Sequence, residues 1–290
     1  MKSFAYHAPS TVEEAVSLLE QLEGESRLLA GGTDLLIQMK RRLVNPQAII
    51  ALNKIASLHY FVEEAANLSF GAFTRVSELE FNTVVCDKAG VLAEAAGKLG
   101  SRQIRNISTV GGNICNAAPS AELAPPLLVL NAQIHLQGAE GKRSVPIESF
   151  FTAPRQTVRQ PTEVLTGFTV DKYVLGTRAV YLRYTRRRAM DIALVSVAVR
   201  VDLAPDGLTV QSARVALGAV APTPIRVKEA EAILIGRELQ AEVIAQAGKV
   251  AAEAASPITD IRSSADYRRH LVNILTVRAL NQVAQARHLS

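Results

Sequence analysis

The sequence predicts an α+β protein of two domains. This prediction rests on the chain length, on the helical and strand patterns, and on the order in which they follow one another. The chain has 290 residues, which suits two domains at about 100–200 residues each. Its first part alternates helical and strand patterns, as α/β units do. Beyond about residue 172, long alternating segments are followed by helical ones, which favours a separate domain of antiparallel strands with a bundle of helices. We therefore expect domains at 1–175 and 176–290.

The N-terminal elements begin with a capping-box pattern at Thr11-Val12-Glu13-Glu14. Apolar residues then recur on one helical face to Leu22. A short apolar strand at 27–30, a glycine pair, a helix over 34–41 and a strand over 47–52 follow. This order predicts a small α/β unit with parallel strands.

The remaining elements follow from periodicity and turn signals. In the middle region we expect strands at 68–73, 133–136 and 164–170, a helix at 91–99, a polar stretch at 101–120, and a helix at 121–130 capped by Ser120. In the C-terminal domain we expect strands at 179–184, 193–203 and 208–220, then helices at 226–235, 239–255 and 265–288.

The composition excludes several classes of protein. Hydrophobic residues make up 48% and charged residues 20%, which suits a globular protein with a core. The net charge of +5 comes from dispersed basic residues without any Trp, so nucleic-acid binding is not favoured. No apolar run approaches the ~20 residues of a membrane span, and the N-terminus lacks a signal-peptide core. We therefore expect a cytoplasmic protein.

The cysteine and histidine content also limits the chemistry. The two cysteines, Cys86 and Cys115, are too few for a disulfide framework. They are also too few for an iron–sulfur cluster, which usually needs four protein ligands. The five histidines are scattered, so no metal site is predicted.

The first candidate site is the segment Leu28-Leu29-Ala30-Gly31-Gly32-Thr33-Asp34-Leu35. A strand runs into a glycine pair, and a helix follows at once. Glycine lets the backbone approach a ligand closely, and free N–H groups at a helix start favour an anion such as a diphosphate. An ordinary tight turn remains the alternative.

The second candidate site is Thr109-Val110-Gly111-Gly112-Asn113-Ile114-Cys115-Asn116. Thr109 and Asn113 can donate to phosphate oxygens, and glycine N–H groups can form an anion-binding concavity. The alternative is a glycine-rich surface loop. Because both segments have the same chemistry, we predict that two glycine turns hold one diphosphate from two sides.

Two further features allow a structural or a functional interpretation. Glu122 lies in the first turn of a predicted helix, where it complements the helix dipole or accepts from sugar hydroxyls. The segment Tyr184 to Asp191 contains Arg186, Arg187 and Arg188. It is either a solvated basic loop or a place where Tyr184 and an arginine meet a flavin or an electron acceptor.

Together these motifs resemble those of the FAD-binding medium subunit of the carbon monoxide dehydrogenase and xanthine dehydrogenase family of molybdenum hydroxylases. The resemblance rests on the two paired glycine segments, on Asn116 to Glu122, and on the Arg-Arg-x-x-Asp-Ile-Ala segment from Arg187 to Ala193. It covers nearly the whole chain. It implies an FAD-binding domain of the p-cresol methylhydroxylase type, with two α/β subdomains, before the C-terminal domain.

The resemblance also implies site residues. Residues from Arg27 through Asp34 should line the adenine and diphosphate side, and residues from Thr109 through Asn113 should cover the diphosphate from the other side. Glu122 should meet ribityl or ribose hydroxyls, although relatives often carry Asp there. A backbone contact from Leu165 and a flavin-proximal Tyr184 are implied as well. The expected cofactor-binding residues are Arg27, Leu28, Leu29, Ala30, Gly31, Gly32, Thr33, Asp34, Thr109, Val110, Gly111, Gly112, Asn113, Glu122, Leu165 and Tyr184.

The function that the resemblance implies is electron transfer. A large partner subunit should hold a molybdenum cofactor, and a small partner should hold two 2Fe-2S clusters, in a heterotrimer that forms dimers. FAD in this chain should pass electrons to NAD, a quinone or oxygen, with no catalytic residue required here. The two alternatives are a stand-alone flavin oxidase of the same fold and a scaffold subunit that has lost its flavin.

Overall fold

The N-terminal unit is a small parallel sheet with two helices. The computed structural model describes residues 2–187 and 190–285. Strands β1 (Ala5–His7), β2 (Ser26–Leu29) and β3 (Ala48–Ala51) pair in the order β1-β3-β2, and both pairs are parallel. Helices α1 (Val12–Gln21) and α2 (Leu35–Lys40) connect them. The predicted order of elements and the parallel pairing are confirmed.

Helix α1 attaches this unit to the rest of the chain. The Thr11 side chain accepts a hydrogen bond from the Glu14 N–H, which fixes the helix start. The buried side chains of α1 pack in one cluster with Leu58 and Val164 of the central region. The N-terminal unit is therefore joined to the central sheet by an apolar contact under α1.

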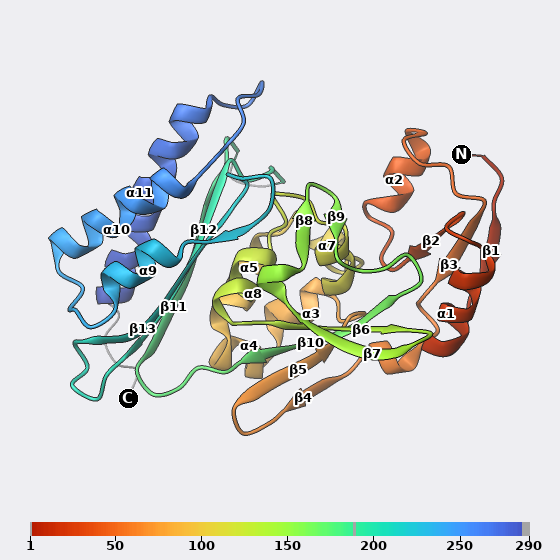
Figure 1. The fold of residues 1–290 in the computed structure, drawn as a ribbon, viewed down its shortest axis with the longest axis horizontal. Helices are drawn as coiled ribbons and strands as arrows, with labels where there is room; N and C mark the ends of the chain where they lie inside the picture. Colours follow the sequence, from red (N-terminus) through yellow and green to blue (C-terminus); the bar gives the residue numbers. More distant parts are fainter. Residues whose placement is uncertain (1, 188–189, 286–290) are drawn as a thin grey trace.

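The central region contains an antiparallel sheet covered by short helices. Its strands lie in the order β4-β5-β10-β6-β7, and a small hairpin, β8 and β9, lies beside it (Figure 1). The strands are β4 (Phe61–Glu63), β5 (Asn67–Gly71), β6 (Gln133–Gly138), β7 (Gly141–Pro146), β8 (Phe151–Ala153), β9 (Gln156–Thr157) and β10 (Val164–Asp171). The helices are α3 (Val76–Phe81), α4 (Thr83–Lys88), α5 (Gly90–Lys98), α6 (Arg102–Arg105), α7 (Val110–Cys115) and α8 (Ala124–Val129), with short 3-10 turns at Ala56–Leu58 and Ile147–Ser149.

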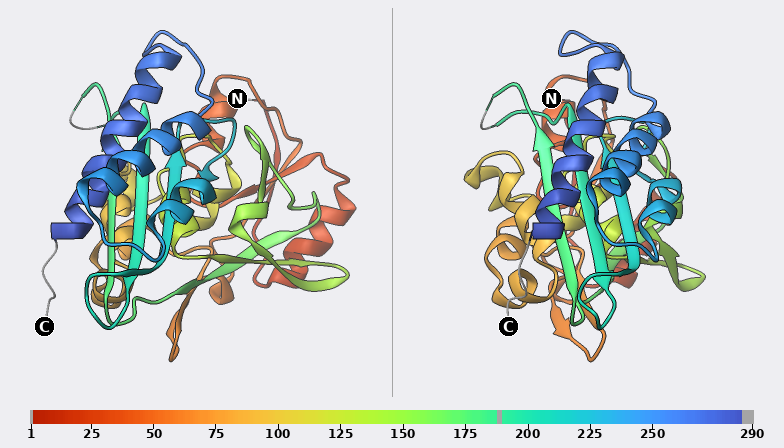
Figure 2. Two further views of the ribbon diagram at one scale, coloured as in Figure 1. Left: turned by 60° about the vertical axis from the view of Figure 1, so that its left-hand side comes forward. Right: turned by 90° about the vertical axis from the view of Figure 1, so that its left-hand side faces the viewer.

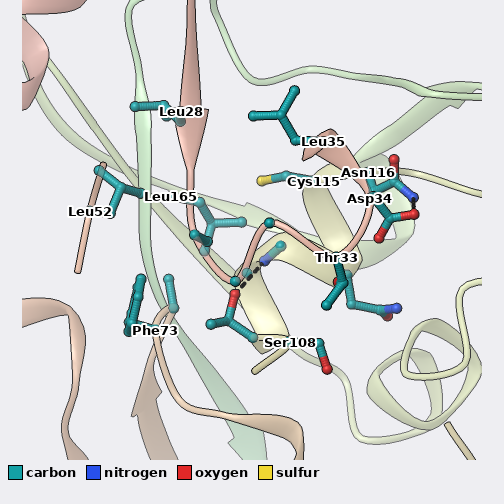
Figure 3. A pocket seen from close by; sticks show the side chains of 18 of the residues that line it. Leu28, Thr33, Asp34, Leu35, Leu52, Phe73, Ser108, Cys115, Asn116 and Leu165 are labelled. Carbon is teal, nitrogen blue, oxygen red and sulfur yellow. Dashed lines mark hydrogen bonds between the residues drawn. The ribbon is translucent and has the colours of Figure 1, made fainter. Parts of the chain in front are cut away.

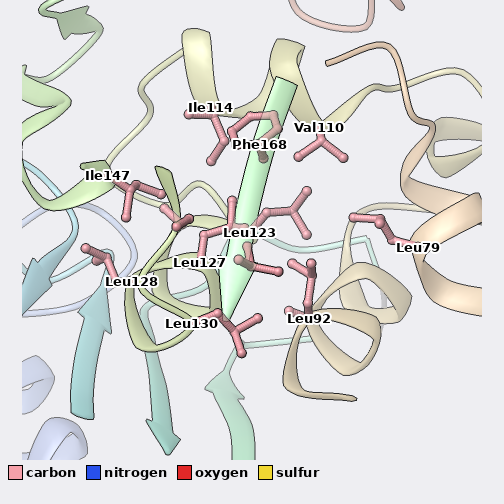
Figure 4. Packing of buried hydrophobic residues seen from close by; sticks show 14 of the residues in the cluster. Leu79, Leu92, Val110, Ile114, Leu123, Leu127, Leu128, Leu130, Ile147 and Phe168 are labelled. Atoms are coloured by element: carbon pink, nitrogen blue, oxygen red, sulfur yellow. The ribbon is translucent and has the colours of Figure 1, made fainter. Parts of the chain in front are cut away.

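Helix α7 is anchored by its apolar side. Val110 and Ile114 are fully buried, and they point into the core beside Phe168 of β10 (Figure 4). Because residues three and four positions apart share one side of a helix, this anchoring leaves Gly112 and Asn113 on other sides. The core thus fixes the orientation of the second glycine pair.

The C-terminal domain is an antiparallel sheet with helices on both faces. Strands β11 (Thr177–Tyr184), β12 (Val195–Leu203), β13 (Val210–Gly218) and β14 (Ile225–Arg226) lie in sequence order. Helices α9 (Lys228–Leu234), α10 (Ala241–Ala254) and α11 (Ala265–Gln285) cover the outer face (Figure 2). Helices α5 and α8 pack against the other face. Strand β12 is buried almost throughout because both faces of the sheet are covered.

Two local predictions are wrong. The stretch at 101–120 is not only a polar loop, since it contains α6 and α7. The helix expected at 121–130 begins at Ala124, and Ser120 does not cap it. Pro125 and Pro126 lie in its first turn, where a missing N–H costs least. None of the helices in the described residues is long and apolar enough to span a membrane.

Candidate functional site: a cavity between two glycine turns

A cavity of about 410 Å³ lies where the N-terminal unit meets the central region. Pockets for small ligands and cofactors commonly measure about 300–1,000 Å³. The turn after β2, the start of α2, the segment around α7, and Leu165 of β10 form its walls (Figure 3). The lining residues are Arg27, Leu28, Ala30, Gly31, Gly32, Thr33, Asp34, Leu35, Gln38, Leu52, Leu58, Ala72, Phe73, Leu99, Ile104, Ser108, Thr109, Gly111, Gly112, Asn113, Cys115, Asn116, Arg159 and Leu165.

The first glycine turn lies directly against the chain that precedes α7. A β-carbon on Gly31 would lie 2.1 Å from the Ile107 carbonyl oxygen, so only glycine permits this approach. Gly32 has φ +74°, which lets the chain reverse into α2. Within the described residues, no protein oxygen accepts from the N–H groups of residues 31–34. The turn therefore presents unused hydrogen-bond donors at the cavity.

The second glycine pair uses its N–H groups differently, which corrects part of the sequence-based expectation. The Gly111 N–H donates to the Ala72 carbonyl at 2.9 Å. The Gly112 N–H donates to the Thr109 hydroxyl oxygen at 3.1 Å, as in a capped helix start. Both donors are therefore already bonded inside the protein, and the expectation of free N–H groups holds for the first turn alone.

The polar side chains of Ser108 and Asn113 lie on the second side of the cavity. The Ser108 hydroxyl and the Asn113 side-chain oxygen are buried, and within the described chain neither has a hydrogen-bond partner. Both residues line the cavity. Because buried polar atoms in folded proteins are nearly always hydrogen-bonded, this arrangement fits a ligand that supplies polar partners there.

The rest of the wall combines apolar and positively charged groups. Leu28, Leu52, Phe73 and Leu165 lie together on one side of the first turn in Figure 3. The Arg159 guanidinium is held by the carbonyl oxygens of Gln160 and Glu163, at 2.8 and 2.6 Å. The cavity thus offers apolar side chains for a flat ring and cationic or N–H groups for an anion.

Two titratable side chains in the wall are shifted by their surroundings. Burial raises the pKa of the Cys115 thiol, against a smaller opposing effect of Arg159, so the thiol stays neutral at pH 7. Partial removal from water also raises the pKa of Asp34, while Arg155 and the hydrogen bond from Asn116 act in the opposite direction. That bond joins Asn116 Nδ2 to Asp34 Oδ1 at 3.1 Å (Figure 3).

Most of the predicted cofactor-binding residues meet at this cavity. Twelve of them are among its lining residues: Arg27, Leu28, Ala30, Gly31, Gly32, Thr33, Asp34, Thr109, Gly111, Gly112, Asn113 and Leu165. Leu29 and Val110 are not, and Val110 points into the core instead. Cys115 and Asn116 end the second candidate segment but were not predicted to bind the cofactor. Sequence reasoning missed Ser108, which directly precedes that segment. It also missed Phe73 and Arg159, which carry no local signal.

Glu122 and Tyr184 lie outside the cavity wall. The two carboxylate oxygens of Glu122 accept hydrogen bonds from the Tyr181 hydroxyl and from Arg183 Nη1 of β11. Burial raises the pKa of Glu122, and the positive charge of Arg183 opposes the shift. Contact between Glu122 and a sugar hydroxyl stays a prediction.

Tyr184 ends β11, and its hydroxyl lies 3.5 Å from that of Tyr267 on α11. Arg186 and Arg187 lie exposed beyond it. Arg188 lies outside the described residues. A contact between Tyr184 or these arginines and the flavin therefore stays a prediction as well.

No group of three or more His, Cys, Asp or Glu side chains in the described residues is placed to hold a metal ion. Unused N–H groups, unpartnered polar side chains and apolar walls around one cavity instead define a binding protein for an anionic ligand with a flat apolar part. Dinucleotide cofactors are such ligands.

Comparison with known proteins identifies the family. The family described as FAD binding domain in molybdopterin dehydrogenase matches residues 2–171, and the CO dehydrogenase flavoprotein C-terminal domain matches residues 180–283. The chain therefore belongs to the FAD-binding medium subunits of the molybdenum hydroxylase family, and FAD is its cofactor.

Individual relatives agree with this assignment. The carbon monoxide dehydrogenase medium chain of Hydrogenophaga pseudoflava is 34% identical over 278 residues, which is 96% of each chain. The xanthine dehydrogenase FAD-binding subunit of Escherichia coli O157:H7 is 30% identical over 286 residues, covering 97% of this chain and 96% of that one. A solved structure of carbon monoxide dehydrogenase from Hydrogenophaga pseudoflava matches with a TM-score of 0.94 at 35% identity, covering 97% of each chain.

Proposed function

We propose that this chain holds FAD in the cavity between the two glycine turns and serves as the electron-transfer subunit of a molybdenum-containing dehydrogenase. The observation that carries the placement is the set of unused N–H groups at residues 31–34, facing the unpartnered Ser108 and Asn113 across one cavity. Backbone N–H groups at such a turn are suited to a diphosphate.

The residues of this chain bind, orient and shield. The N–H groups of the first turn and the hydroxyls of Ser108 and Thr109 donate to phosphate oxygens from opposite sides. Leu28, Leu52, Phe73 and Leu165 cover flat rings and exclude water. The redox chemistry itself, acceptance and release of electrons, is supplied by FAD when it is bound.

The partners that complete this function follow from the kind of relatives that the chain has. Medium chains of carbon monoxide dehydrogenase imply a large and a small subunit beside them. We assign the molybdenum cofactor to the large partner and the 2Fe-2S clusters to the small one, since this chain has only Cys86 and Cys115 and a cluster usually needs four ligands. Electrons then pass from the clusters to FAD and on to NAD, a quinone or oxygen, in a heterotrimer that forms dimers.

A binding experiment tests the placement of the cofactor. The full chain, stripped of flavin, is titrated with FAD and with FMN while flavin fluorescence is followed. FMN lacks the diphosphate bridge, so we expect at least about 100-fold weaker binding, the value of two to three charge-assisted hydrogen bonds. Equal affinity for the two flavins would place the diphosphate elsewhere.

A matched pair of serine variants sharpens this test. Ser108→Ala should weaken FAD binding by about fivefold to tenfold, as expected for one lost hydrogen bond. Ser144→Ala, at a serine that bonds His135 on the outer side of the sheet, should leave the affinity unchanged. Similar losses in both variants would show that Ser108 does not face the ligand.

A separate experiment tests the role in a complex. The tagged chain is purified from cells that express its partner genes, and iron, molybdenum and flavin are measured. Flavin with no oxidase activity in the isolated chain, and co-purified iron and molybdenum, support the subunit assignment. Substrate oxidation by the isolated chain would support a stand-alone oxidase instead. Failure to take up FAD would support a scaffold.

The acceptor can be tested at the exposed arginines of the β11–β12 connection. We expect Arg186→Ala and Arg187→Ala to raise the apparent KM for an anionic acceptor, because positive charges raise the encounter rate with anions. An unchanged KM at low ionic strength would remove this segment from the acceptor site.

A further inference from the structure

A polar contact bridges the two sides of the cavity at its edge. Asp34 follows the first glycine pair, and Asn116 follows α7. The Asn116 amide group donates to Asp34 Oδ1 at 3.1 Å, and its oxygen accepts from Arg155 Nη1 at 3.4 Å. Arg155 lies in the turn of the β8–β9 hairpin. One side chain thus links three segments that are distant in the sequence.

The local backbone geometry shows that this contact is specifically held. Asp34 stands at the position that caps α2, yet its side chain makes no cap hydrogen bond, although Asp is a preferred cap. Its carboxylate instead accepts the hydrogen bond from the Asn116 side chain. Ala117 and Arg155 both have positive φ, +45° and +62°, and the Arg155 N–H donates to the Ala117 carbonyl at 2.9 Å. Such backbone conformations persist where surrounding contacts enforce them.

Two other contacts of the N-terminal unit lie away from the cavity. The apolar cluster under α1 joins it to the central sheet near Val164, and Gln137 of β6 donates to Glu13 of α1 at 2.7 Å. Neither Glu13 nor Gln137 lines the cavity, whereas Asp34 and Asn116 both do. The hydrogen bond between Asn116 and Asp34 is therefore placed to resist separation of the first glycine turn from α7.

We propose that Asp34, Asn116 and Arg155 form a clasp that keeps the first glycine turn closed over the bound dinucleotide and so slows its release. This proposal rests on the FAD site described above. The three side chains are positioning residues, since they act by holding the N–H groups of the turn against the ligand. The clasp should affect mainly the dissociation rate, because opening precedes release, while association with an open cavity should change little.

The experiment measures the rate at which the full chain releases FAD. The loaded chain is mixed with an excess of a second flavin-binding protein that traps released FAD, and the change in flavin fluorescence is followed. Asp34→Ala and Asn116→Ala should each raise the release rate by about tenfold, the value of one hydrogen bond to a charged group. The double variant should also release about tenfold faster, not a hundredfold, because both substitutions remove the same contact.

Two further variants separate the clasp from direct ligand contact. Arg155 does not line the cavity, so Arg155→Ala should raise the release rate by about threefold, through the weaker bond to Asn116 alone. The exchange Asp34→Asn with Asn116→Asp rebuilds the hydrogen bond with donor and acceptor reversed. It should return the release rate to within about threefold of the original.

Gln137→Ala is the matched control, since it removes a polar bridge between the same two units away from the cavity. Its release rate should stay within about twofold of the original chain, as for other substitutions remote from the site. Thermal unfolding of each apo variant shows whether the fold survives. A release rate about a hundredfold higher in the double variant would overturn the clasp, and so would an exchange variant that releases FAD as fast as the single variants. Either result would leave the FAD site itself intact. A chain that never binds FAD would overturn the site itself.

Discussion

The two glycine turns share a sequence pattern but differ in what their N–H groups contact. No described protein oxygen accepts from residues 31–34, whereas Gly111 and Gly112 donate to Ala72 and Thr109. The first turn leaves a parallel strand at the edge of a small sheet. The second begins a helix that lies on the core. A helix start on a core needs its donors capped, and a turn at a sheet edge does not.

This difference shows that a glycine pair can contribute to a ligand site in two ways. In the first turn, glycine leaves N–H groups that no protein oxygen accepts from within the described residues. In the second, glycine removes the side chain that would separate α7 from the neighbouring backbone, since a β-carbon on Gly111 would lie 2.8 Å from the Ala72 carbonyl oxygen. The hydroxyl groups of Ser108 and Thr109 lie beside it at the cavity, where they can act as donors. We therefore expect the first turn to bind the ligand directly and the second to position its neighbours.

The largest expected effect is that of Gly31→Ala. Its β-carbon would lie 2.1 Å from the Ile107 carbonyl oxygen and 2.8 Å from the Ile107 carbonyl carbon, and both are backbone atoms that cannot rotate away. We expect the free energy of unfolding to fall by about 3 kcal/mol, at the upper end for overpacking, and FAD uptake to be lost. Denaturant unfolding and flavin absorbance measure the two effects.

The control for that change is Gly97→Ala in α5. The nearest atom to its β-carbon would be the Glu80 carboxylate oxygen, at an ordinary van der Waals distance of 3.4 Å. A compatible glycine-to-alanine change in a helix stabilises by about 0.4–1 kcal/mol, so this variant should bind FAD normally. If Gly31→Ala behaved like Gly97→Ala, the close approach of the two turns would be wrong.

The first turn is also the part of the site that sequence reasoning predicts best. Strand, glycine pair and helix follow one another within residues 27–41, so local patterns are enough to place Gly31 and Gly32. The parallel pairing and the antiparallel C-terminal strands also follow from local patterns and element order. These features depend on periodicity, which the sequence carries directly.

The parts that could not be predicted depend on contacts between distant residues. The free or bonded state of the Gly111 N–H depends on Ala72, and the partners of Glu122 come from β11, about sixty residues further along. Arg159 reaches the cavity through the β8–β9 hairpin, whose short strands leave little periodicity. Tertiary structure decides such contacts, and no local pattern encodes them.

Gly111→Ala should have the second largest effect, with a different balance between stability and binding. The added carbon would press on Ala72, at 2.8 Å from its carbonyl oxygen and 2.9 Å from its β-carbon. We expect a loss of about 1–3 kcal/mol in unfolding free energy. Because the Gly111 N–H is already bonded within the protein, FAD affinity should fall less than in Gly31→Ala. The reverse order of affinities would remove the distinction between the two turns.

Thr109 tests the cap that closes the second turn. Thr109→Val keeps the shape of the side chain but loses the oxygen that accepts from the Gly112 N–H. We expect about 1 kcal/mol less stability, the usual value of a helix cap, and several-fold weaker FAD binding. Thr109→Ser keeps the oxygen and should resemble the original chain in both measurements. Equal losses in the two variants would show that the methyl group contributes as much as the hydroxyl cap.

The smallest expected effect concerns pH, and it too distinguishes the turns. The first turn carries the carboxyl group of Asp34, whose pKa is raised by its partial removal from water. A raised pKa means that the folded chain binds this proton more tightly than the unfolded chain. At neutral pH the ionised Asp34 carboxylate contributes least favourably to stability. Its contribution becomes more favourable as the pH falls through the raised pKa of the folded chain, towards the ordinary pKa of the unfolded chain.

Asp34→Asn removes that titration. The stability of the original apo chain relative to this variant should therefore rise as the pH is lowered from 7 towards 4. Thr109→Ser, in the turn where Thr109 and Asn113 do not titrate, should show a pH profile parallel to that of the original chain. Unfolding free energies at several pH values give both differences. If the difference in unfolding free energy between the original chain and Asp34→Asn did not change with pH, the pKa of Asp34 would not be raised. The polar surroundings of the first turn would then compensate fully for its lost contact with water.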